Sequence, residues 1–434
     1  MSHSGARIPT LKPGAAERLS EFLAKSVALP NAPPLFLGVS NARETLWKDQ
    51  AGNVNYSDPK SPQVTEDTVT ELFSQTKLVT CNHPPAQLTE CQVAALQLVD
   101  QGLVSLDSPE DVETHLPELS ALGVLLAYDV NGAPLVVPPV QNITLRMLLS
   151  HTAGFVYERA MTLLTKWYED NPRQPLLGSE TTISNFATPL IYEPGTQWRY
   201  STSIDWAGKL VERISGMDLE EYFKKHIYPT CSITSFTFFP TDEVKSRKMV
   251  MCFRQEDGTI RADPNTFGLD RPTDPTKVSR DFLSGGGGLF GTQKDYLALL
   301  RGLLRSDPRY EAERGGGKAL LSSESYAELF KGCVKTKKGL AILGEFVERP
   351  HYFDPPANPG NVEHSVGFLL NLEDFKGGRK AGSGTWSGAA KTQYWIDPTS
   401  GIVAICGTQL LPANPDPWFE TYKAFEKAVY AELE

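Results

Sequence analysis

The sequence predicts an α/β protein in which the two chain ends build one unit around a mostly helical middle. Three observations indicate this fold class. Short strand-like segments follow an amphipathic helix near the N-terminus, strand-like segments return from Ser365 onward, and the last residues form another amphipathic helix. Between these groups the chain shows helical patterns joined by long connections rich in proline and glycine. We therefore expect the helical part to be inserted into the α/β domain.

The N-terminal part of the α/β domain is assigned to residues 1–72. Residues 15–28 read as an amphipathic helix, and residues 35–39 and 45–48 read as short strands. The mostly helical domain follows and is assigned to residues 73–350.

Residues 351–434 are expected to complete the α/β domain. Strand patterns occur at residues 366–372, 392–396 and 402–406. The final helix carries one apolar stripe, with side chains at spacings of four, three and four residues: Trp418, Tyr422, Phe425 and Val429. This stripe is typical of a helix with one buried face.

Ser74-Gln-Thr-Lys77 supplies a candidate nucleophile and its base. A serine hydroxyl is a weak nucleophile at neutral pH and needs a neighbouring group to accept its proton. Lys77 lies about one helical turn after Ser74, on the same face. A lysine titrates near ~10.4, so it must be buried among suitable neighbours to act as a base at neutral pH. The alternative is an ordinary helix start with a solvated lysine.

A second Ser-x-x-Lys sequence, Ser57 to Lys60, reads as a turn. Pro59 lies inside it and Pro62 follows it, and proline breaks a helix. No such residue surrounds Ser74, which can therefore sit at the start of a helix. Free backbone N–H groups there would favour an oxyanion.

Five signatures in a fixed order carry a resemblance to a known family. They are Ser74-Gln-Thr-Lys77, Leu148-Leu-Ser-His-Thr-Ala-Gly154, Glu193-Pro-Gly-Thr-Gln-Trp-Arg-Tyr200-Ser, Ser284-Gly-Gly-Gly-Gly-Leu289 and Trp386-Ser-Gly388. The chain resembles the serine β-lactamase-related superfamily, and within it class C β-lactamases, their esterase relatives and above all the fungal statin-type transesterase branch. The resemblance implies a β-lactamase/transpeptidase-like fold, with an antiparallel sheet flanked by helices.

The resemblance also implies roles for individual residues. Ser74 would be the acylated nucleophile, Lys77 its general base and Tyr200 the proton relay; the alternative for Tyr200 is a packed aromatic ring. Trp386, Ser387 and Gly388 match the position of the Lys-Thr-Gly sequence of β-lactamases. The N–H of Ala389 would join that of Ser74 in an oxyanion hole, where one donor is typically worth ~3 kcal/mol.

Two departures from the family pattern argue against β-lactam hydrolysis. Thr202 stands where many relatives have asparagine, and Trp386 stands where a lysine would pair with a β-lactam carboxylate. Both changes favour neutral esters or thioesters. Trp386 is expected to form a pocket wall, and core packing is the alternative.

A third departure is the segment at residues 81–91. Relatives have one unbroken helix here, whereas Pro84 and Pro85 must break it and Thr89 offers a new N-cap. The segment is either a looped insertion near the site or the product of mistranslation or mis-splicing.

Two other segments suggest functions that the sequence does not support. His151 would suit a Ser-His-Asp triad, yet the chain has no Gly-x-Ser-x-Gly elbow, so we expect a hydrogen-bonding loop residue under the site. Residues 285–288 are all glycine but lack the Lys-Ser or Lys-Thr of a phosphate-binding loop. We expect close backbone packing there, followed by a strand and a helix from Thr292.

Composition excludes several classes of protein. The chain has 434 residues, 40% hydrophobic and 22% charged, which is typical of a globular enzyme. Its net charge of −10 argues against nucleic-acid binding. Six scattered cysteines indicate reduced thiols, and neither an apolar leader nor a stretch of ~20 apolar residues is present, so we expect a cytoplasmic protein away from membranes.

We therefore expect a serine acyltransferase or esterase that needs no cofactor or metal. The acyl group would come from a small ester or thioester, with an acyl-carrier protein as one candidate donor, and would pass from Ser74 to an alcohol or to water. The alternative is a catalytically inactive relative that binds a ligand or partner.

Overall fold

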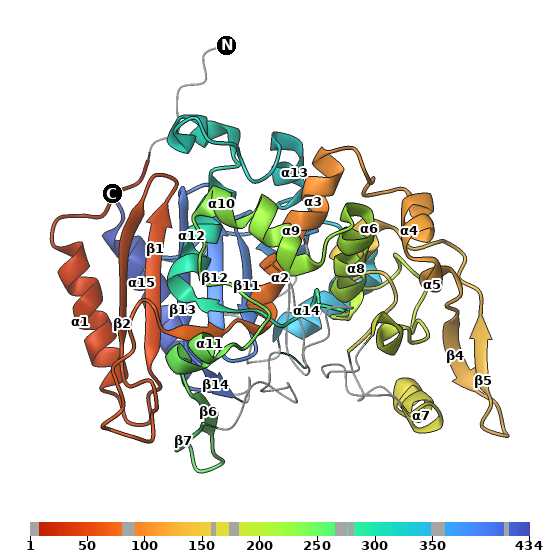
Figure 1. Cartoon of the computed structure of the whole chain (residues 1–434), viewed down its shortest axis with the longest axis horizontal. Coiled ribbons are helices and arrows are strands. Elements are labelled where there is room, and N and C mark those ends of the chain that lie inside the picture. Colours follow the sequence, from red (N-terminus) through yellow and green to blue (C-terminus); the bar gives the residue numbers. More distant parts are fainter. Residues whose placement is uncertain are drawn as a thin grey trace.

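A seven-stranded antiparallel sheet, built from both ends of the chain, forms one side of the molecule (Figure 1). The computed structural model describes residues 8–79, 92–157, 162–172, 182–264, 276, 282–348, 361–411 and 416–434. The strand order is β2-β1-β13-β12-β11-β10-β9. The strands are β1 (Leu35–Asn41), β2 (Thr45–Ala51), β9 (Val362–His364), β10 (Leu369–Asn371), β11 (Gly384–Gly388), β12 (Thr392–Asp397) and β13 (Ile402–Gly407).

Helices cover both faces of this sheet. Successive side chains of a strand point to opposite faces. On one face, Trp395 of β12 packs in a core with α1 (Ala15–Val27) and α15 (Trp418–Glu432). On the other face, Tyr394 and Ile396 of β12 join the large core that includes α12 (Gln293–Leu304) and the helical half. The predicted fold class is confirmed.

The remaining elements form the helical half and its connections, and in Figure 1 the helices α4 to α8 lie on the side away from the large sheet. The helices are α2 (Thr76–Val79), α3 (Gln92–Asp100), α4 (Pro109–His115), α5 (Pro117–Ser120), α6 (Leu145–Leu149), α7 (Thr162–Asp170), α8 (Ser203–Ser215), α9 (Leu219–His226), α10 (Tyr228–Cys231), α11 (Asp242–Arg247), α13 (Ser323–Glu328) and α14 (Lys337–Glu348). Short 3-10 helices are η1 (Phe73–Gln75), η2 (Ile183–Phe186) and η4 (Pro308–Arg314). Within the described part of the chain, no helix combines the length and apolarity needed to cross a membrane.

Three smaller sheets complete the structure. β4 (Val124–Tyr128) pairs with β5 (Pro134–Val137), and β6 (Met251–Arg254) lies between β7 (Ile260–Asp263) and β14 (Leu410–Leu411). β3 (Val69–Glu71) pairs with β8 (Phe290–Thr292). The Thr292 side chain accepts a hydrogen bond from the backbone N–H of Asp295 and caps α12, which confirms the predicted strand and helix after the glycine run.

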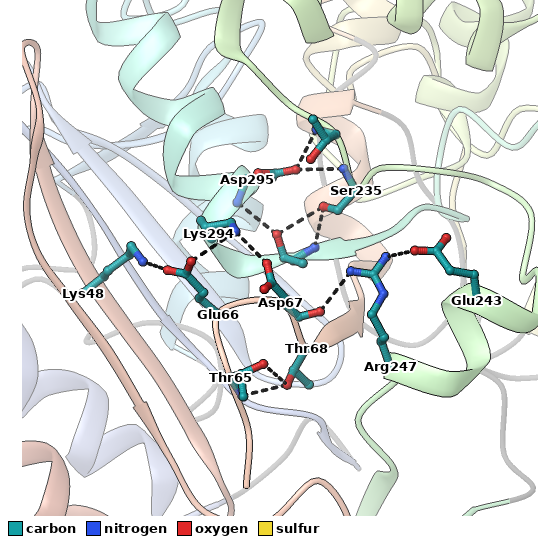
Figure 2. Close-up of polar contacts among 12 residues, drawn as sticks. Lys48, Thr65, Glu66, Asp67, Thr68, Ser235, Glu243, Arg247, Lys294 and Asp295 are labelled. Atoms are coloured by element: carbon teal, nitrogen blue, oxygen red, sulfur yellow. Dashed lines mark hydrogen bonds and ion pairs between the residues drawn. The ribbon is translucent and has the colours of Figure 1, made fainter. Parts of the chain in front are cut away.

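A network of charges fixes the turn that leads into β3 (Figure 2). Lys294 of α12 lies 2.7 Å from Asp67 and 3.4 Å from Glu66, which also pairs with Lys48 of β2. Arg247 of α11 donates a hydrogen bond to the backbone carbonyl of Asp67 at 3.3 Å. These side chains are partly exposed, so each pair contributes little alone, but together they tie β2, α11 and α12 to the strand before Ser74.

One predicted strand is partly wrong. The pattern at residues 366–372 gives a strand at residues 369–371, preceded by a tight turn and by β9, which the sequence analysis missed. The Ser365 hydroxyl accepts hydrogen bonds from the backbone N–H groups of Gly367 and Phe368, at 2.9 and 2.8 Å, and so bends the chain. Residues 81–91 lie outside the described part of the chain, and the domain boundaries at 72 and 350 stay predictions.

Candidate active site

A strained turn presents Ser74. β3 ends at Glu71, and Phe73 adopts a left-handed backbone conformation with φ 44°, which is unusual for a bulky residue. The Phe73 ring is held in a small apolar cluster with Met251, Ala390 and Leu411. Phe73 is the first residue of η1 and Ser74 the second, so Ser74 lies at a helical start, as expected from the sequence. Strain of this kind is often found at catalytic residues.

Lys77 is completely buried, so it is not a solvated lysine at a helix start. Its ammonium nitrogen Nζ donates hydrogen bonds to the carbonyl oxygen of Gly286 at 2.8 Å and to the hydroxyl of Tyr157 at 3.3 Å. Nζ also lies 5.5 and 5.4 Å from the ring centroids of Tyr157 and Tyr200. These contacts hold the end of Lys77 between two phenol rings and the glycine run.

Tyr157 is a further residue of the site, and it was not predicted from the sequence. Its ring lies 4.7 Å from that of Tyr200, and its backbone N–H donates a hydrogen bond to the carbonyl of Tyr200 at 3.3 Å. Burial, followed by the neighbouring Tyr200 and Asp205, raises the pKa of the Tyr157 phenol well above its usual value. Tyr157 therefore stays protonated at neutral pH. One sequence signal could have indicated it: Tyr157 follows, by three residues, the family signature that ends at Gly154.

Asp205 of α8 is a second residue to which we assigned no role from the sequence, although residues 203–213 resemble the transesterase branch. It is fully buried, and its carboxylate oxygen Oδ1 accepts hydrogen bonds from the hydroxyl of Ser284 at 2.8 Å and the backbone N–H of Gly286 at 2.9 Å. Burial raises the pKa of Asp205 to about 6, and the positive charge of Lys77 opposes this shift. The glycine run thus supplies backbone groups rather than a phosphate-binding loop.

His151 is a buried loop residue beside Tyr200. Its ring nitrogen Nδ1 lies 3.1 Å from the hydroxyl oxygen of Ser201, and its ring centroid lies 5.1 Å from that of Tyr200. Burial, with smaller effects from His364 and Lys77, lowers the pKa of His151 well below its usual value. His151 is therefore neutral near pH 7, and its contacts are those of the hydrogen-bonding loop residue that we expected.

Trp386 lies on β11 and is fully buried. Its ring stacks on that of Phe346 at 6.4 Å and contacts the rings of Tyr200 and His364 at 6.4 and 5.7 Å. The ring therefore packs directly behind the proposed relay tyrosine. Whether a substrate contacts Trp386 as a pocket wall stays a prediction.

The end of β11 packs against the turn that carries Ser74. A Cβ atom on Gly388 would lie 2.7 Å from the backbone carbonyl oxygen of Leu72 and would collide with the hydroxyl of Thr392. Only glycine fits this approach. The neighbouring Ala389 side chain packs on the cluster of Phe73. This places Ser387, Gly388 and Ala389 beside the nucleophile turn, and the oxyanion-hole role of the Ala389 and Ser74 N–H groups stays a prediction.

Lys391 holds the turn after Ala389. It is buried, its backbone is left-handed with φ 60°, and its Nζ donates a hydrogen bond to the carbonyl of Leu410 at 3.2 Å. Its Nζ lies 3.7 Å from the carboxylate of Asp416. Burial lowers the pKa of Lys391 to about 8, although Asp416 opposes this shift. The contacts of Lys391 join β11 and β12 to the start of α15.

A family model described as Beta-lactamase matches residues 28–427. The chain belongs to the beta-lactamase family. The match spans the nucleophile turn, the glycine run and β11, so the candidate site lies inside the family domain.

Two named relatives of this beta-lactamase family protein are fungal enzymes. Monacolin J acid methylbutanoyltransferase from Aspergillus terreus is 29% identical over 410 residues, which are 90% of this chain and 91% of the relative. Lovastatin esterase from Penicillium rubens is 30% identical over 399 residues, which are 86% and 88% of the two chains. Because its relatives are named as an acyltransferase and an esterase, the protein is a serine acyltransferase or esterase.

Solved structures agree with this family. Unliganded simvastatin synthase from Aspergillus terreus has a TM-score of 0.78 and 26% identity, and the match covers 97% of this chain and 99% of that one. EstCE1, described as a hydrolase with promiscuous acyltransferase activity, has a TM-score of 0.70 at 18% identity and covers 96% and 98% of the two chains. The second likeness shows the fold alone.

Proposed function

We propose that this protein transfers acyl groups through an ester formed on Ser74. The observation that carries the proposal is the burial of Ser74 and Lys77 on one helical turn, with the Lys77 ammonium group held by Gly286 and Tyr157. A lysine in a dry site can give up its proton far more easily than one in water.

In the first half of the reaction, neutral Lys77 takes the proton of the Ser74 hydroxyl, and the Ser74 oxygen bonds to the acyl carbon. The N–H groups of Ser74 and Ala389 stabilise the negative oxygen of the tetrahedral intermediate. The bond from the acyl carbon to the leaving oxygen or sulfur then breaks, and Tyr200 delivers a proton to that leaving atom. Tyr200 then recovers a proton from the protonated Lys77. The position of the Tyr200 ring, whose centroid lies 5.4 Å from Nζ of Lys77, supports this pairing of the two groups.

In the second half, an alcohol gives its proton to the same pair of groups and attacks the acyl carbon. Ser74 leaves and recovers its proton. The rings of Trp386, Phe346 and Tyr200 pack together, and we propose that they line the acceptor side of the site as an apolar wall, which favours an alcohol over water. Such a wall offers few groups to hold a water molecule or a carboxylate.

The donor is proposed to be a neutral ester or a thioester, with an acyl-carrier protein as one possible source. The relatives named as a methylbutanoyltransferase and a lovastatin esterase support small acyl groups on hydroxylated acceptors, as in secondary metabolism. We also propose a cytoplasmic setting, supported by the buried free thiols of Cys231, Cys252, Cys333 and Cys406.

The test is the product ratio at a fixed concentration of a short-chain p-nitrophenyl ester, measured against increasing alcohol. The proposal expects the ester product to rise with alcohol while total turnover of the donor continues. Formation of free acid alone at every alcohol concentration would make the protein an esterase, which the 30% identity to lovastatin esterase favours as the second candidate. Rapid opening of penicillin or cephalosporin would contradict the proposed role of Trp386.

A further inference from the structure

A buried carboxylate stands next to the proposed base, outside every family signature quoted above. Asp205 lies in the first turn of α8, five residues after Tyr200, and none of its surface is exposed. A carboxylate taken out of water is costly unless donors and charges compensate it. The groups that surround Asp205 show what its carboxylate stabilises.

Gly286 connects Asp205 to Lys77. Its backbone N–H donates a hydrogen bond to Oδ1 of Asp205 at 2.9 Å, and its carbonyl oxygen accepts one from Nζ of Lys77 at 2.8 Å. The Ser284 hydroxyl donates a second hydrogen bond to the same Oδ1 at 2.8 Å. Asp205 therefore fixes the glycine run at the point where that run orients the lysine.

The charge of Asp205 also acts on Lys77. The described titratable groups that face Lys77 come from several segments: Tyr157, Tyr200, Asp205 and His151. Of these four groups, Asp205 is the carboxylate, and it carries a negative charge when ionised. Opposite charges in a buried site stabilise each other's charged forms. The ionised Asp205 therefore makes it harder for Lys77 to lose its proton.

We propose that Asp205 is a positioning residue that holds Gly286 against Lys77 and sets the pH at which Lys77 becomes a base. This inference rests on the proposed function, in which neutral Lys77 accepts the Ser74 proton. It assigns two separable effects to one side chain, one through hydrogen bonds and one through charge.

Asp205→Asn separates these effects, because the amide oxygen can still accept both hydrogen bonds but the charge is gone. The measurement is kcat/KM against pH with a p-nitrophenyl ester. Spontaneous hydrolysis of the ester and the pH dependence of p-nitrophenol absorbance are subtracted. Activity falls on the acid side when the base is protonated. Without the Asp205 charge, Lys77 holds its proton more weakly, so the acid limb should move to lower pH by about 1 unit or more.

Asp205→Ala removes both the charge and the hydrogen bonds, so it should move the acid limb to lower pH and also lower kcat/KM across the whole pH range, because the glycine run loses its anchor. Glu212→Gln is the matched control. Glu212 is a buried carboxylate on the same helix, but it pairs with Lys209 at 2.9 Å, and burial raises its pKa to about 7. Glu212→Gln should leave the acid limb in place.

An acid limb that stays in place, or moves to higher pH, in folded Asp205→Asn overturns the inference. The same holds if Glu212→Gln moves the limb equally. If Asp205→Asn does not fold, Ser284→Ala decides: losing this donor makes Asp205 easier to protonate, which should shift the limb downward by a smaller amount, and no shift overturns the inference.

Lys77→Ala distinguishes this failure from failure of the proposed function. A folded Lys77→Ala variant that keeps a tenth of the activity refutes the proposed function itself. An inactive Lys77→Ala together with an unmoved limb in Asp205→Asn refutes only the role of Asp205.

Discussion

The molecule contains two Ser-x-x-Lys sequences, and their surroundings have little in common. Ser57 and Lys60 are both exposed, and their backbone N–H groups bond to Asn55 and Asp58 in a local turn. Ser74 and Lys77 are both buried. The backbone of the first segment is held by its immediate neighbours, and the Ser57 hydroxyl also accepts a hydrogen bond from the distant backbone N–H of Ala262 at 3.0 Å. The lysine of the second segment is held by residues that are distant in the chain.

This difference shows where the chemistry of the motif comes from. The partners of Lys77 are Tyr157, 80 residues away, and Gly286, 209 residues away. A lysine in water is protonated in all but about one in a thousand molecules at pH 7, whereas a buried one can be neutral far more often. The spacing of three residues between serine and lysine is therefore necessary for the proposed reaction but carries no activity by itself.

The largest loss of activity should come from substitutions at Ser74 and Lys77, with the same substitutions at Ser57 and Lys60 as controls. Ser74→Ala and Lys77→Ala should each lower kcat/KM by about 10³-fold or more, and the double variant should lose little beyond either single one, because the two groups act as a unit. Ser57→Ala and Lys60→Ala should keep full activity. Steady-state kinetics and circular dichroism check both pairs, and a Ser74→Ala variant with a tenth of the activity would remove the contrast.

The two tyrosines beside Lys77 sharpen the comparison further. Tyr200→Phe should lower kcat by ~10²–10⁴-fold, the usual range for a positioned acid or base. Tyr157→Phe removes a hydrogen-bond partner of Lys77 but no relay, so its loss should be nearer to about tenfold, within the range expected for losing one hydrogen bond. Equal losses would mean that the relay role is shared, and a loss below about threefold in Tyr200→Phe would make it a packed ring.

Gly388→Ala tests the contact between β11 and the nucleophile turn. The added methyl group would lie 2.7 Å from the Leu72 carbonyl oxygen and should push β11 away from Ser74. We expect kcat to fall by about 10²-fold, as for the loss of an oxyanion donor, with a lower melting temperature. Gly317→Ala, at an exposed position, serves as the control. An unchanged kcat in Gly388→Ala would show that the packing of β11 against the Ser74 turn is not needed for catalysis.

Residues with local signals were predictable, and residues that depend on distant contacts were not. The final helix and β12 and β13 follow from side-chain periodicity, which each segment carries by itself. β9 was missed because it has three residues, too few to show a pattern. In the site, the helical start at Ser74 was expected from the absence of helix breakers, but the left-handed backbone of Phe73 was not. The burial of Lys77 and the contact of Asp205 with Gly286 depend on how distant segments fold together, so no spacing in the sequence indicates them.

The most direct test of the central claim is covalent labelling with a fluorophosphonate, followed by peptide mapping. The account predicts one adduct on Ser74 of the folded protein, no adduct on Ser57, no labelling of Ser74→Ala, and slow labelling of Lys77→Ala. An unlabelled Ser74 in folded protein, or equal labelling of Ser57, would contradict the account and favour an inactive binding protein.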